Sequence, residues 1–272
     1  MATAVPQAGF FSSIGAAFYS VALSWGEVTH FALRTFGWLL VRPPRRSTIT
    51  PNFYQVGVRS VPVVSITGLF IGMVLAVQSY GELARMPTMK GWLGSIVNTS
   101  VIRELGPVLA ATMLAGRIGS AMAAELGTMR VTEQIDALSA LGMNPIHYLV
   151  APRLVACVLL IPLLTIMADF MGVMGGALIA IQYYGIEPYQ YWSLSQRLIG
   201  LWDINVGLVK SMIFGAAICI ISCHRGFNST GGAEGVGKAA TEAFVHSFVA
   251  ILVLDFFLAM FFNSLHTMIW PR

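Results

Sequence analysis

Residues 54–80 read YQVGVRSVPVVSITGLFIGMVLAVQSY, an almost entirely uncharged run in which Arg59 is the single charged residue. A helix that crosses a bilayer needs about 20 consecutive, mostly apolar residues. This run is long enough to cross, and it predicts a transmembrane helix.

The rest of the chain has the same character. Of its 272 residues, 56% are hydrophobic and 10% are charged, with a mean hydropathy of +0.74. Soluble domains carry about 25% charged residues, so lipid must cover part of this surface. Four more stretches are long and apolar enough to span, at roughly 92–124, 148–183, 204–223 and 243–265. The sequence therefore predicts an all-α integral membrane protein with five transmembrane helices.

Residues 8–41 have a mixed character, with Glu27, His30 and Arg34 spaced through an aromatic-rich run. Five side chains fall close to one helical face: Phe18, Val21, Ala22, Trp25 and Val28. This pattern favours an amphipathic helix lying in the interface and held by Trp25 and Trp38; a sixth span is the alternative. Pro43 and Pro44 end the helix. We therefore divide the chain into an interfacial helix with a basic linker (1–46) and a transmembrane domain (47–272).

Basic residues near the ends of spans indicate orientation, because cytoplasmic loops are enriched in Lys and Arg. With a cytoplasmic N-terminus, the cytoplasmic side holds Arg42, Arg45, Arg46, Arg130, Arg153, Arg225 and Lys238. The other side holds Arg85, Lys90, Arg197 and Arg272. We expect a multi-pass protein of the inner membrane in this orientation.

Two loops carry further expectations. Residues 184–203 predict a short outer helix with four aromatic residues at headgroup depth: Tyr189, Tyr191, Trp192 and Trp202. Residues 224–238 contain five glycines and predict a flexible cytoplasmic connector.

Motifs for catalysis, metal binding or nucleotide binding do not occur: there is no HExxH, GxSxG or GxxxxGK[ST]. We expect no catalytic residue, no metal and no cofactor on this chain, so that any ATP and Mg²⁺ would be bound by another chain. The net charge of +4 is dispersed, so no nucleic-acid partner is expected.

Charges inside the apolar stretches are candidate functional residues, because a charge in the bilayer costs from about 3 kcal/mol upward. They are Arg103, Glu104 and Lys210, with Asp169 and Asp255 as weaker candidates. They either line a substrate path or form ion pairs that fix helix packing. Neighbouring residues on a helix point about 100° apart, so Arg103 and Glu104 are expected to face different partners.

One apolar face of the first span contains Leu69, Met73, Val77 and Tyr80. It forms either core or the wall of a lipid-sized cavity. Glycines at 68 and 72, at 172 and 176, and in the stripe Gly116, Gly119, Ala123 and Gly127 predict close helix contacts, within or between protomers.

Residues 125–145, ELGTMRVTEQIDALSALGMNP, form a charged segment between two spans. A helix over 131–141 places Val131, Ile135 and Leu138 on one face, while Glu133 and Asp136 lie elsewhere; Gly142 and Pro145 stop it. It is either a connector on lipid heads or a docking site for a soluble partner. The anionic cytoplasmic leaflet repels acidic residues, which favours the docking site over the connector.

The block from Arg103 to Pro145, RELGPVLAATMLAGRIGSAMAAELGTMRVTEQIDALSALGMNP, resembles the MlaE/YrbE-type permeases of ABC lipid transporters. Shorter matches are GLFIGMVLAVQSY (68–80), LVAPRLVACVLLIPLLT (149–165), KSMIFG (210–215) and VHSFVAILVLDFFL (245–258), so the resemblance covers roughly residues 50–262. One departure is Glu242, which stands where some relatives carry a basic residue.

The resemblance implies an interfacial helix, five spans and a homodimer. Its implied partners are a cytoplasmic ABC ATPase, an MCE-domain protein on the outer face, a small STAS-type regulator, and phospholipid in a cavity. It implies transport that maintains outer-membrane lipid asymmetry. Carried over by position, the cavity residues are Leu69, Met73, Val77, Tyr80, Arg103, Glu104 and Lys210, and the ATPase-coupling residues are Glu125, Gly127, Met129, Arg130, Glu133 and Asp136.

Two other functions fit the residues. An ion-coupled secondary transporter or channel would use the intramembrane carboxylates, would work without an ATPase and is expected to carry inverted repeats. A structural scaffold would bind no lipid.

Overall fold

The computed structural model describes residues 10–41, 44, 46–85 and 91–269, and these residues form helices without any β-strand. Five helical segments are long and apolar enough to cross a membrane: Thr48–Leu83, Leu93–Val131, Ile146–Tyr183, Leu201–Phe227 and Gly232–Ile269. The predicted fold class and all five spans are confirmed. The helices are α1 (Phe10–Val41), α2 (Arg46–Val56), α3 (Val61–Leu83), α4 (Leu93–Ser100), α5 (Gly106–Leu114), α6 (Ser120–Val131), α7 (Gln134–Ala140), α8 (Ala151–Ala177), α9 (Pro188–Leu198), α10 (Leu201–Phe227) and α11 (Gly232–Ile269).

Two spans contain π-helical turns where other helices press against them. The second span runs through Val101–Leu105 and Ala115–Gly119, and the third begins with Ile146–Val150 and ends with Leu178–Tyr183. Pro107 lies two residues after the first of these turns and has no backbone N–H to donate to the preceding turn. A π-turn absorbs such a local mismatch and redirects the side chains that it carries.

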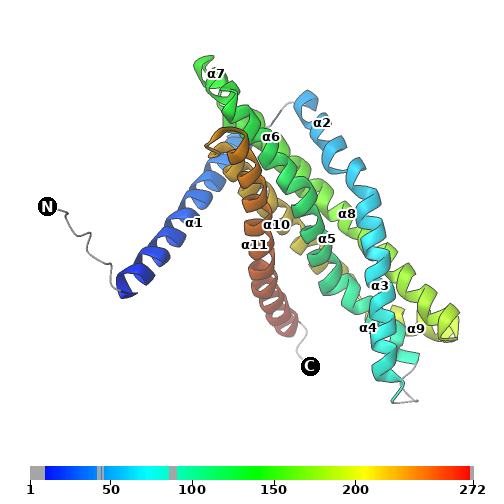
Figure 1. Cartoon of the computed structure of the whole chain (residues 1–272). Helices are drawn as coiled ribbons and strands as arrows, with labels where there is room; N and C mark the ends of the chain where they lie inside the picture. The colour runs from blue at the N-terminus through cyan, green and yellow to red at the C-terminus, as the bar shows by residue number, and fades with distance from the viewer. Residues whose placement is uncertain (1–9, 42–43, 45, 86–90, 270–272) are drawn as a thin grey trace.

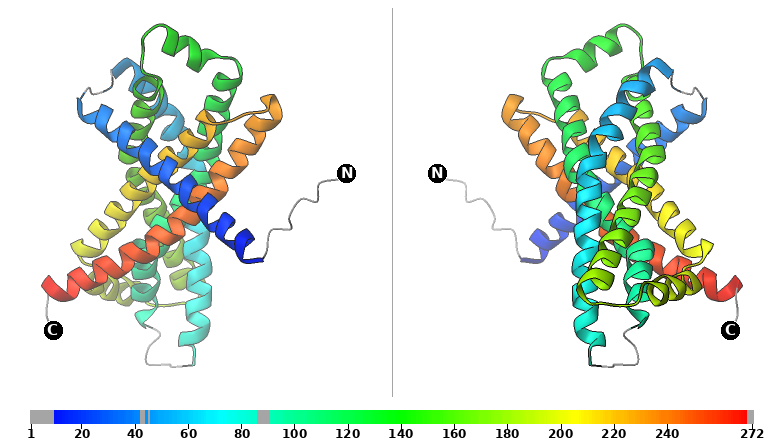
Figure 2. Two further views of the ribbon diagram at one scale, coloured as in Figure 1. Left: turned by 90° about the vertical axis from the view of Figure 1, so that its left-hand side faces the viewer. Right: turned by 90° about the vertical axis from the view of Figure 1, so that its right-hand side faces the viewer.

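The two ends of the bundle are distinct (Figure 1). Helix α7, the start of α2 and the turn between α10 and α11 lie at one end, whereas α9 and the end of α11 lie toward the other; Figure 2 agrees. Arg130, Arg153, Arg225 and Lys238 therefore belong to one end of the molecule, as their grouping by sequence requires. Arg42, Arg45, Lys90 and Arg272 lie outside the described residues, and assignment of the α7 end to the cytoplasm stays a prediction.

Helices α3 and α8 form the most extensive contact in the chain, and small residues make it possible. A Cβ on Gly68 would overlap the carbonyl of Ala168, and a Cβ on Gly72 would overlap the carbonyl of Gly172. Gly175 approaches the carbonyl of Leu69 in the same way. The predicted glycine contacts are confirmed, and they lie within one protomer.

The second glycine stripe also packs inside the chain. Gly119 faces Ser222 of α10, Gly127 faces Val236 of α11, and Gly226 approaches the carbonyl of Ala123. Helix α6 is thus wedged between α10 and α11, so the segment that follows α6 is carried by packed helices.

Helix α1 projects from the bundle (Figure 1), and its second half packs on α8, α10 and the turn at Ile146–Val150. The packed residues Val28, Phe31, Ala32, Thr35 and Leu39 continue the predicted apolar stripe at helical spacing. The side chains of Phe18, Val21 and Ala22 lie outside the described ones. Helix α1 is not among the five segments apolar enough to span; its place in the interface stays a prediction.

The loop predictions were partly wrong. Helix α9 is the predicted outer helix, yet Tyr191 is fully buried, whereas Tyr189 is 78% exposed. The connector predicted over 224–238 is mostly helical, because α10 continues to Phe227 and α11 begins at Gly232. The positive φ angles of Gly231 and Gly232, 93° and 67°, let the chain reverse within a few residues.

Buried hydrogen bonds hold α9 on α4. The Tyr191 hydroxyl donates to Asn98 Oδ1 at 3.0 Å, and Asn98 Nδ2 donates to Ser195 Oγ at 3.0 Å. Burial raises the pKa of Tyr191 to about 12, so the phenol stays protonated at physiological pH. The Tyr191 hydroxyl therefore remains a hydrogen-bond donor to Asn98.

We expect Tyr191→Phe to lower the free energy of unfolding by about 1–3 kcal/mol, because it leaves the buried Asn98 oxygen without its donor. Tyr189→Phe is the matched control on the exposed face of the same helix and should change nothing. Thermal unfolding of the purified variants in detergent measures both. Equal stability of the two variants would contradict the role given to this hydrogen bond.

Candidate functional site

Four of the five predicted intramembrane charges gather with Asp203 into one cluster, here called the charged cluster: Arg103, Glu104, Asp203, Lys210 and Asp255. The π-turn Val101–Leu105 carries the first two, the beginning and middle of α10 carry Asp203 and Lys210, and α11 carries Asp255. Three segments far apart in the sequence thus meet at these side chains.

Lys210 is the centre of the charged cluster. Its side chain is fully buried, and Nζ lies 2.5 Å from Glu104 Oε2 and 3.0 Å from Asp255 Oδ1. A buried ammonium is costly unless it is paired, and here two carboxylates from different helices pair with it. Lys210 therefore ties the second, fourth and fifth spans together.

Arg103 and Glu104 form the accessible edge of the charged cluster, with side chains 34% and 42% exposed. Arg103 Nε lies 3.7 Å from Glu104 Oε1, and Arg103 Nη1 lies 3.7 Å from Asp203 Oδ1. As expected, Arg103 and Glu104 have different partners, Asp203 for Arg103 and Lys210 for Glu104, although the two side chains also contact each other.

An open groove runs beside the accessible edge of the charged cluster, between the α4 end of the second span and α11. It has a volume of about 510 Å³ and is lined by Thr99, Ser100, Arg103, Glu104, Phe256, Ala259, Met260 and Asn263. Charged groups therefore stand at one wall of the groove, and apolar side chains of α11 form the facing wall. This combination suits an amphipathic ligand.

The structure does not bring all the predicted cavity residues together. Lys210 lies behind Glu104 and not on the groove surface, and the α3 residues Leu69, Met73, Val77 and Tyr80 do not line the groove. Tyr80 stacks on Tyr184, with ring centroids 3.6 Å apart, near the C-terminal end of α3. Val77 is 49% exposed on a separate face. Within one protomer, the exposed face of α3 and the charged cluster therefore belong to separate surfaces.

Asp203 is a member of the charged cluster that sequence reasoning missed. It lies three residues after Gly200 and accepts a hydrogen bond from the Gly200 N–H at 3.0 Å, so it looks like an ordinary helix-start residue. Its other oxygen faces Arg103. Asp169, by contrast, was a candidate in the sequence but lies outside the charged cluster. It packs against Gly106 of the second span.

The segment 125–145 lies at the α7 end of the bundle, and here it is called the coupling segment. The predicted helix over 131–141 is instead broken: α6 runs to Val131, Glu133 takes a left-handed φ of 58°, and α7 covers Gln134–Ala140. Val131 is consequently 43% exposed, whereas Ile135 is buried. The predicted stop at Gly142 is confirmed, with a φ of 75°.

Ion pairs brace the coupling segment. Arg130 Nη1 lies 2.5 Å from Asp136 Oδ1 across the break, and Arg153 Nη2 of α8 lies 3.0 Å from Glu125 Oε2. Gly127 is buried and Met129 is packed on the core. Of the predicted coupling residues, Glu125, Glu133 and Asp136 are exposed, and Glu125 is the one paired with Arg153.

The segment ends in exposed apolar side chains. Leu141 is 75% exposed and Met143 is 40% exposed, and Val131, at the end of α6, is 43% exposed. Exposed apolar groups framed by charges mark sites of protein or membrane contact. The second span is 39 residues long, or about 58 Å at 1.5 Å per residue, so it is longer than the hydrocarbon layer of about 30 Å.

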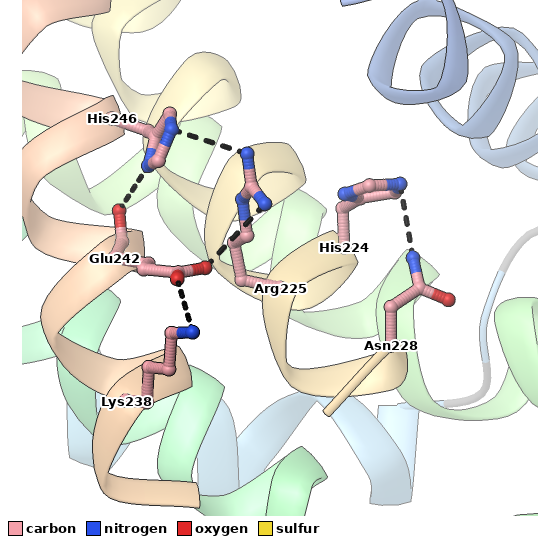
Figure 3. Close-up of polar contacts among 6 residues, drawn as sticks. All are labelled: His224, Arg225, Asn228, Lys238, Glu242 and His246. Carbon is pink, nitrogen blue, oxygen red and sulfur yellow. Dashed lines mark hydrogen bonds and ion pairs between the residues drawn. The ribbon is translucent and has the colours of Figure 1, made fainter. Parts of the chain in front are cut away.

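Glu242 belongs to a second polar cluster at the same end (Figure 3). Its carboxylate lies 3.5 Å from Arg225 Nη1 and 3.9 Å from Lys238 Nζ. The Glu242 carbonyl accepts from His246 Nδ1 at 2.7 Å, which leaves His246 Nε2 to accept from Arg225 Nη2 at 3.2 Å. Glu242 thus neutralises the basic residues beside it.

Comparison with known proteins agrees with this architecture. Residues 49–261 match the family model "Permease MlaE". The chain is 44% identical over 215 residues to a probable ABC transporter permease protein of Synechocystis sp., covering 79% of this chain and 81% of the relative. It is 35% identical over 227 residues to the intermembrane phospholipid transport system permease protein MlaE of Haemophilus influenzae, covering 82% and 87%. A third relative is the chloroplastic protein TRIGALACTOSYLDIACYLGLYCEROL 1 of Arabidopsis thaliana, 41% identical over 208 residues, with 76% and 59% covered. With its five spans, its match to the family model over residues 49–261 and relatives named as permeases, the chain belongs to the MlaE family of ABC transporter permeases.

Proposed function

We propose that this protein is the membrane subunit of an ABC transporter that moves phospholipid between the inner membrane and an MCE-domain partner. The observation that carries the proposal is the groove that joins the charged cluster to the apolar wall of α11. A phospholipid needs both surfaces, since its headgroup is charged and its chains are apolar. The phospholipid transport named for the Haemophilus relative supports the same substrate class.

The groove is too open to enclose a lipid within one protomer, and this supports a homodimer. Helix α11 has only 17% of its most apolar window buried, and it exposes Val253, Phe256, Phe257, Met260 and Phe261. In the proposed dimer, a second copy closes the cavity and adds the α3 surface that carries Leu69, Met73 and Val77. The substrate is then held mainly by apolar burial, with Arg103 and Glu104 at its headgroup.

ATP hydrolysis belongs to a partner in this proposal. The sequence contains no nucleotide-binding loop of the GxxxxGK[ST] kind, and the Synechocystis and Haemophilus relatives are named as permeases. A cytoplasmic ATPase with bound ATP and Mg²⁺ would dock on the coupling segment through Val131, Leu141 and Met143, with Glu133 and Asp136 fixing its orientation.

Movement of the ATPase would reach the charged cluster through rigid packing. The coupling segment continues α6, and α6 is wedged between α10 and α11. A displacement of α7 therefore shifts the helices that carry Lys210 and Asp255. An MCE-domain protein at the α9 end would receive or supply the lipid, a STAS-type regulator would act on the ATPase, and the system would maintain outer-membrane lipid asymmetry.

We expect Glu133→Lys combined with Asp136→Lys to reduce co-purification of the ATPase at least tenfold and to stop ATP-driven lipid transfer. The two substitutions invert the exposed charge and break the pair with Arg130, and like charges across an interface repel. Glu234→Lys, at the exposed start of α11, is the control at the same end. Undiminished ATPase binding and transport in the double variant would show that docking occurs elsewhere.

The alternative of an ion-coupled transporter or channel makes a different prediction. Asp255 and Glu104 already neutralise Lys210, which favours a fixed ion-pair network over carboxylates that exchange ions. Lipid transfer that follows a proton or sodium gradient, and ignores ATP, would favour the alternative.

A further inference from the structure

Arg117 is an exception among the basic side chains. Six Arg or Lys residues with described side chains are half-buried or buried: Arg103, Arg117, Arg130, Arg153, Lys210 and Arg225. Five of them lie within 4.0 Å of a carboxylate. In the described part of the chain Arg117 has no such partner; it donates only to the neutral oxygens Ser60 Oγ and Gln55 O.

A second unpaired arginine stands beside it. Arg59 and Arg117 line one pocket of about 120 Å³, and their charges repel each other. Asn52 and Gln55 add amide groups to the same pocket, while Ile118 and Met122 form its apolar wall. No described carboxylate lies within ion-pair distance of Arg59 either; its guanidinium lies 5.5 Å from the centre of the Tyr54 ring.

Two like charges that share a pocket without a counter-ion indicate an anionic ligand. Planar guanidinium groups bind phosphate oxygens in pairs, and the amides of Asn52 and Gln55 supply further donors. The pocket is small enough for a phosphate group and far too small for acyl chains. Its chemistry therefore suits one phosphate.

The position of the pocket indicates the source of that phosphate. Helix α3 has 23 residues from Val61 to Leu83, or about 34 Å at 1.5 Å per residue, which matches a hydrocarbon layer of about 30 Å. Arg59 lies two residues before α3 and hence at headgroup depth. Val58, 60% exposed, and Val61, 38% exposed, flank it with apolar surface on which acyl chains can lie.

We propose that Arg59 and Arg117 bind the headgroup phosphate of a phospholipid in the leaflet on the α7 side of the membrane. The site is separate from the charged cluster, because Arg117 follows Arg103 by 14 helical residues, about 21 Å along the second span. The bound lipid clamps the start of α3 to the Ala115–Gly119 turn and the α6 helix that follows it.

The test uses the full chain in vesicles of phosphatidylethanolamine and phosphatidylglycerol doped with a phospholipid that carries a photoreactive headgroup. Irradiation and peptide mapping should place label on residues 52–59 and 117–122. Arg59→Gln, at an exposed residue that the fold tolerates, should lower this labelling about tenfold, as loss of a charge-assisted contact predicts. Arg117→Lys keeps the positive charge but removes the planar guanidinium group, so it should lower the labelling by an intermediate amount.

The matched control is Arg197→Gln on α9, an exposed arginine at the opposite end of the bundle, which should leave the labelling unchanged. Labelling that persists in millimolar inorganic phosphate identifies the lipid headgroup as the source of the bound phosphate. Labelling of 52–59 and 117–122 that is equal in the wild type and in Arg59→Gln overturns the proposal. Inorganic phosphate that displaces all the label overturns the assignment to lipid.

Discussion

Replacing Lys210 with Met should abolish lipid transfer and lower the free energy of unfolding by about 3–5 kcal/mol. The reason is the environment of Nζ, which is fully buried between Glu104 and Asp255. Removing one partner of a buried ion pair leaves the other charge without compensation, and this costs more than the pair contributes. Thermal unfolding in detergent and transfer of a fluorescent phospholipid from proteoliposomes measure the two effects.

A triple variant separates stability from transport. Lys210→Met with Glu104→Gln and Asp255→Asn removes all three charges, so no buried carboxylate is left unpaired. It should recover most of the lost stability and still fail to transport, because the groove wall then keeps Arg103 but has lost the carboxylate of Glu104. Full transport by the triple variant would show that the charged cluster only fixes helix packing.

Gly72→Val should prevent α3 and α8 from packing, with an expected loss of about 3 kcal/mol or more. Its Cβ would overlap the carbonyl of Gly172, and two helix backbones cannot separate locally to make room. The yield of monodisperse protein and the unfolding temperature report the effect.

The matched control lies on the same helix. A Cβ on Gly81 meets no atom within 4 Å, so Gly81→Val should express and unfold like the wild type. If Gly72→Val were as stable as Gly81→Val, the close backbone contact between α3 and α8 would not determine the fold.

Much of the fold follows from patterns that are local in sequence. Apolar runs of spanning length located all five spans, and glycines at helical spacing indicated the faces of α3 and α8 that make close contacts, without showing that these two helices pack on each other. These patterns succeed because the bilayer imposes a length and close packing excludes side chains. These patterns do not show which side chains of a neighbouring helix contact a given residue, so the burial of Tyr191 against Asn98 was not predicted.

The candidate site depends on contacts that are remote in sequence. Sequence alone indicated Arg103, Glu104 and Lys210, because charges inside apolar runs are conspicuous. Asp203 was missed because its place near Gly200 has a local explanation in the capping of α10. The break at Glu133 was missed as well, since a left-handed φ is unusual for Glu and no glycine marks it.

We expect this chain to move phospholipid only when a separate ATPase drives it. The direct measurement is transfer of labelled phospholipid between proteoliposomes holding the chain and an MCE-domain protein, with the ATPase and ATP each present or omitted. We predict transfer only when both are present, and none from the Lys210→Met variant. Transfer at the full rate by the chain alone, without nucleotide, would contradict the claim.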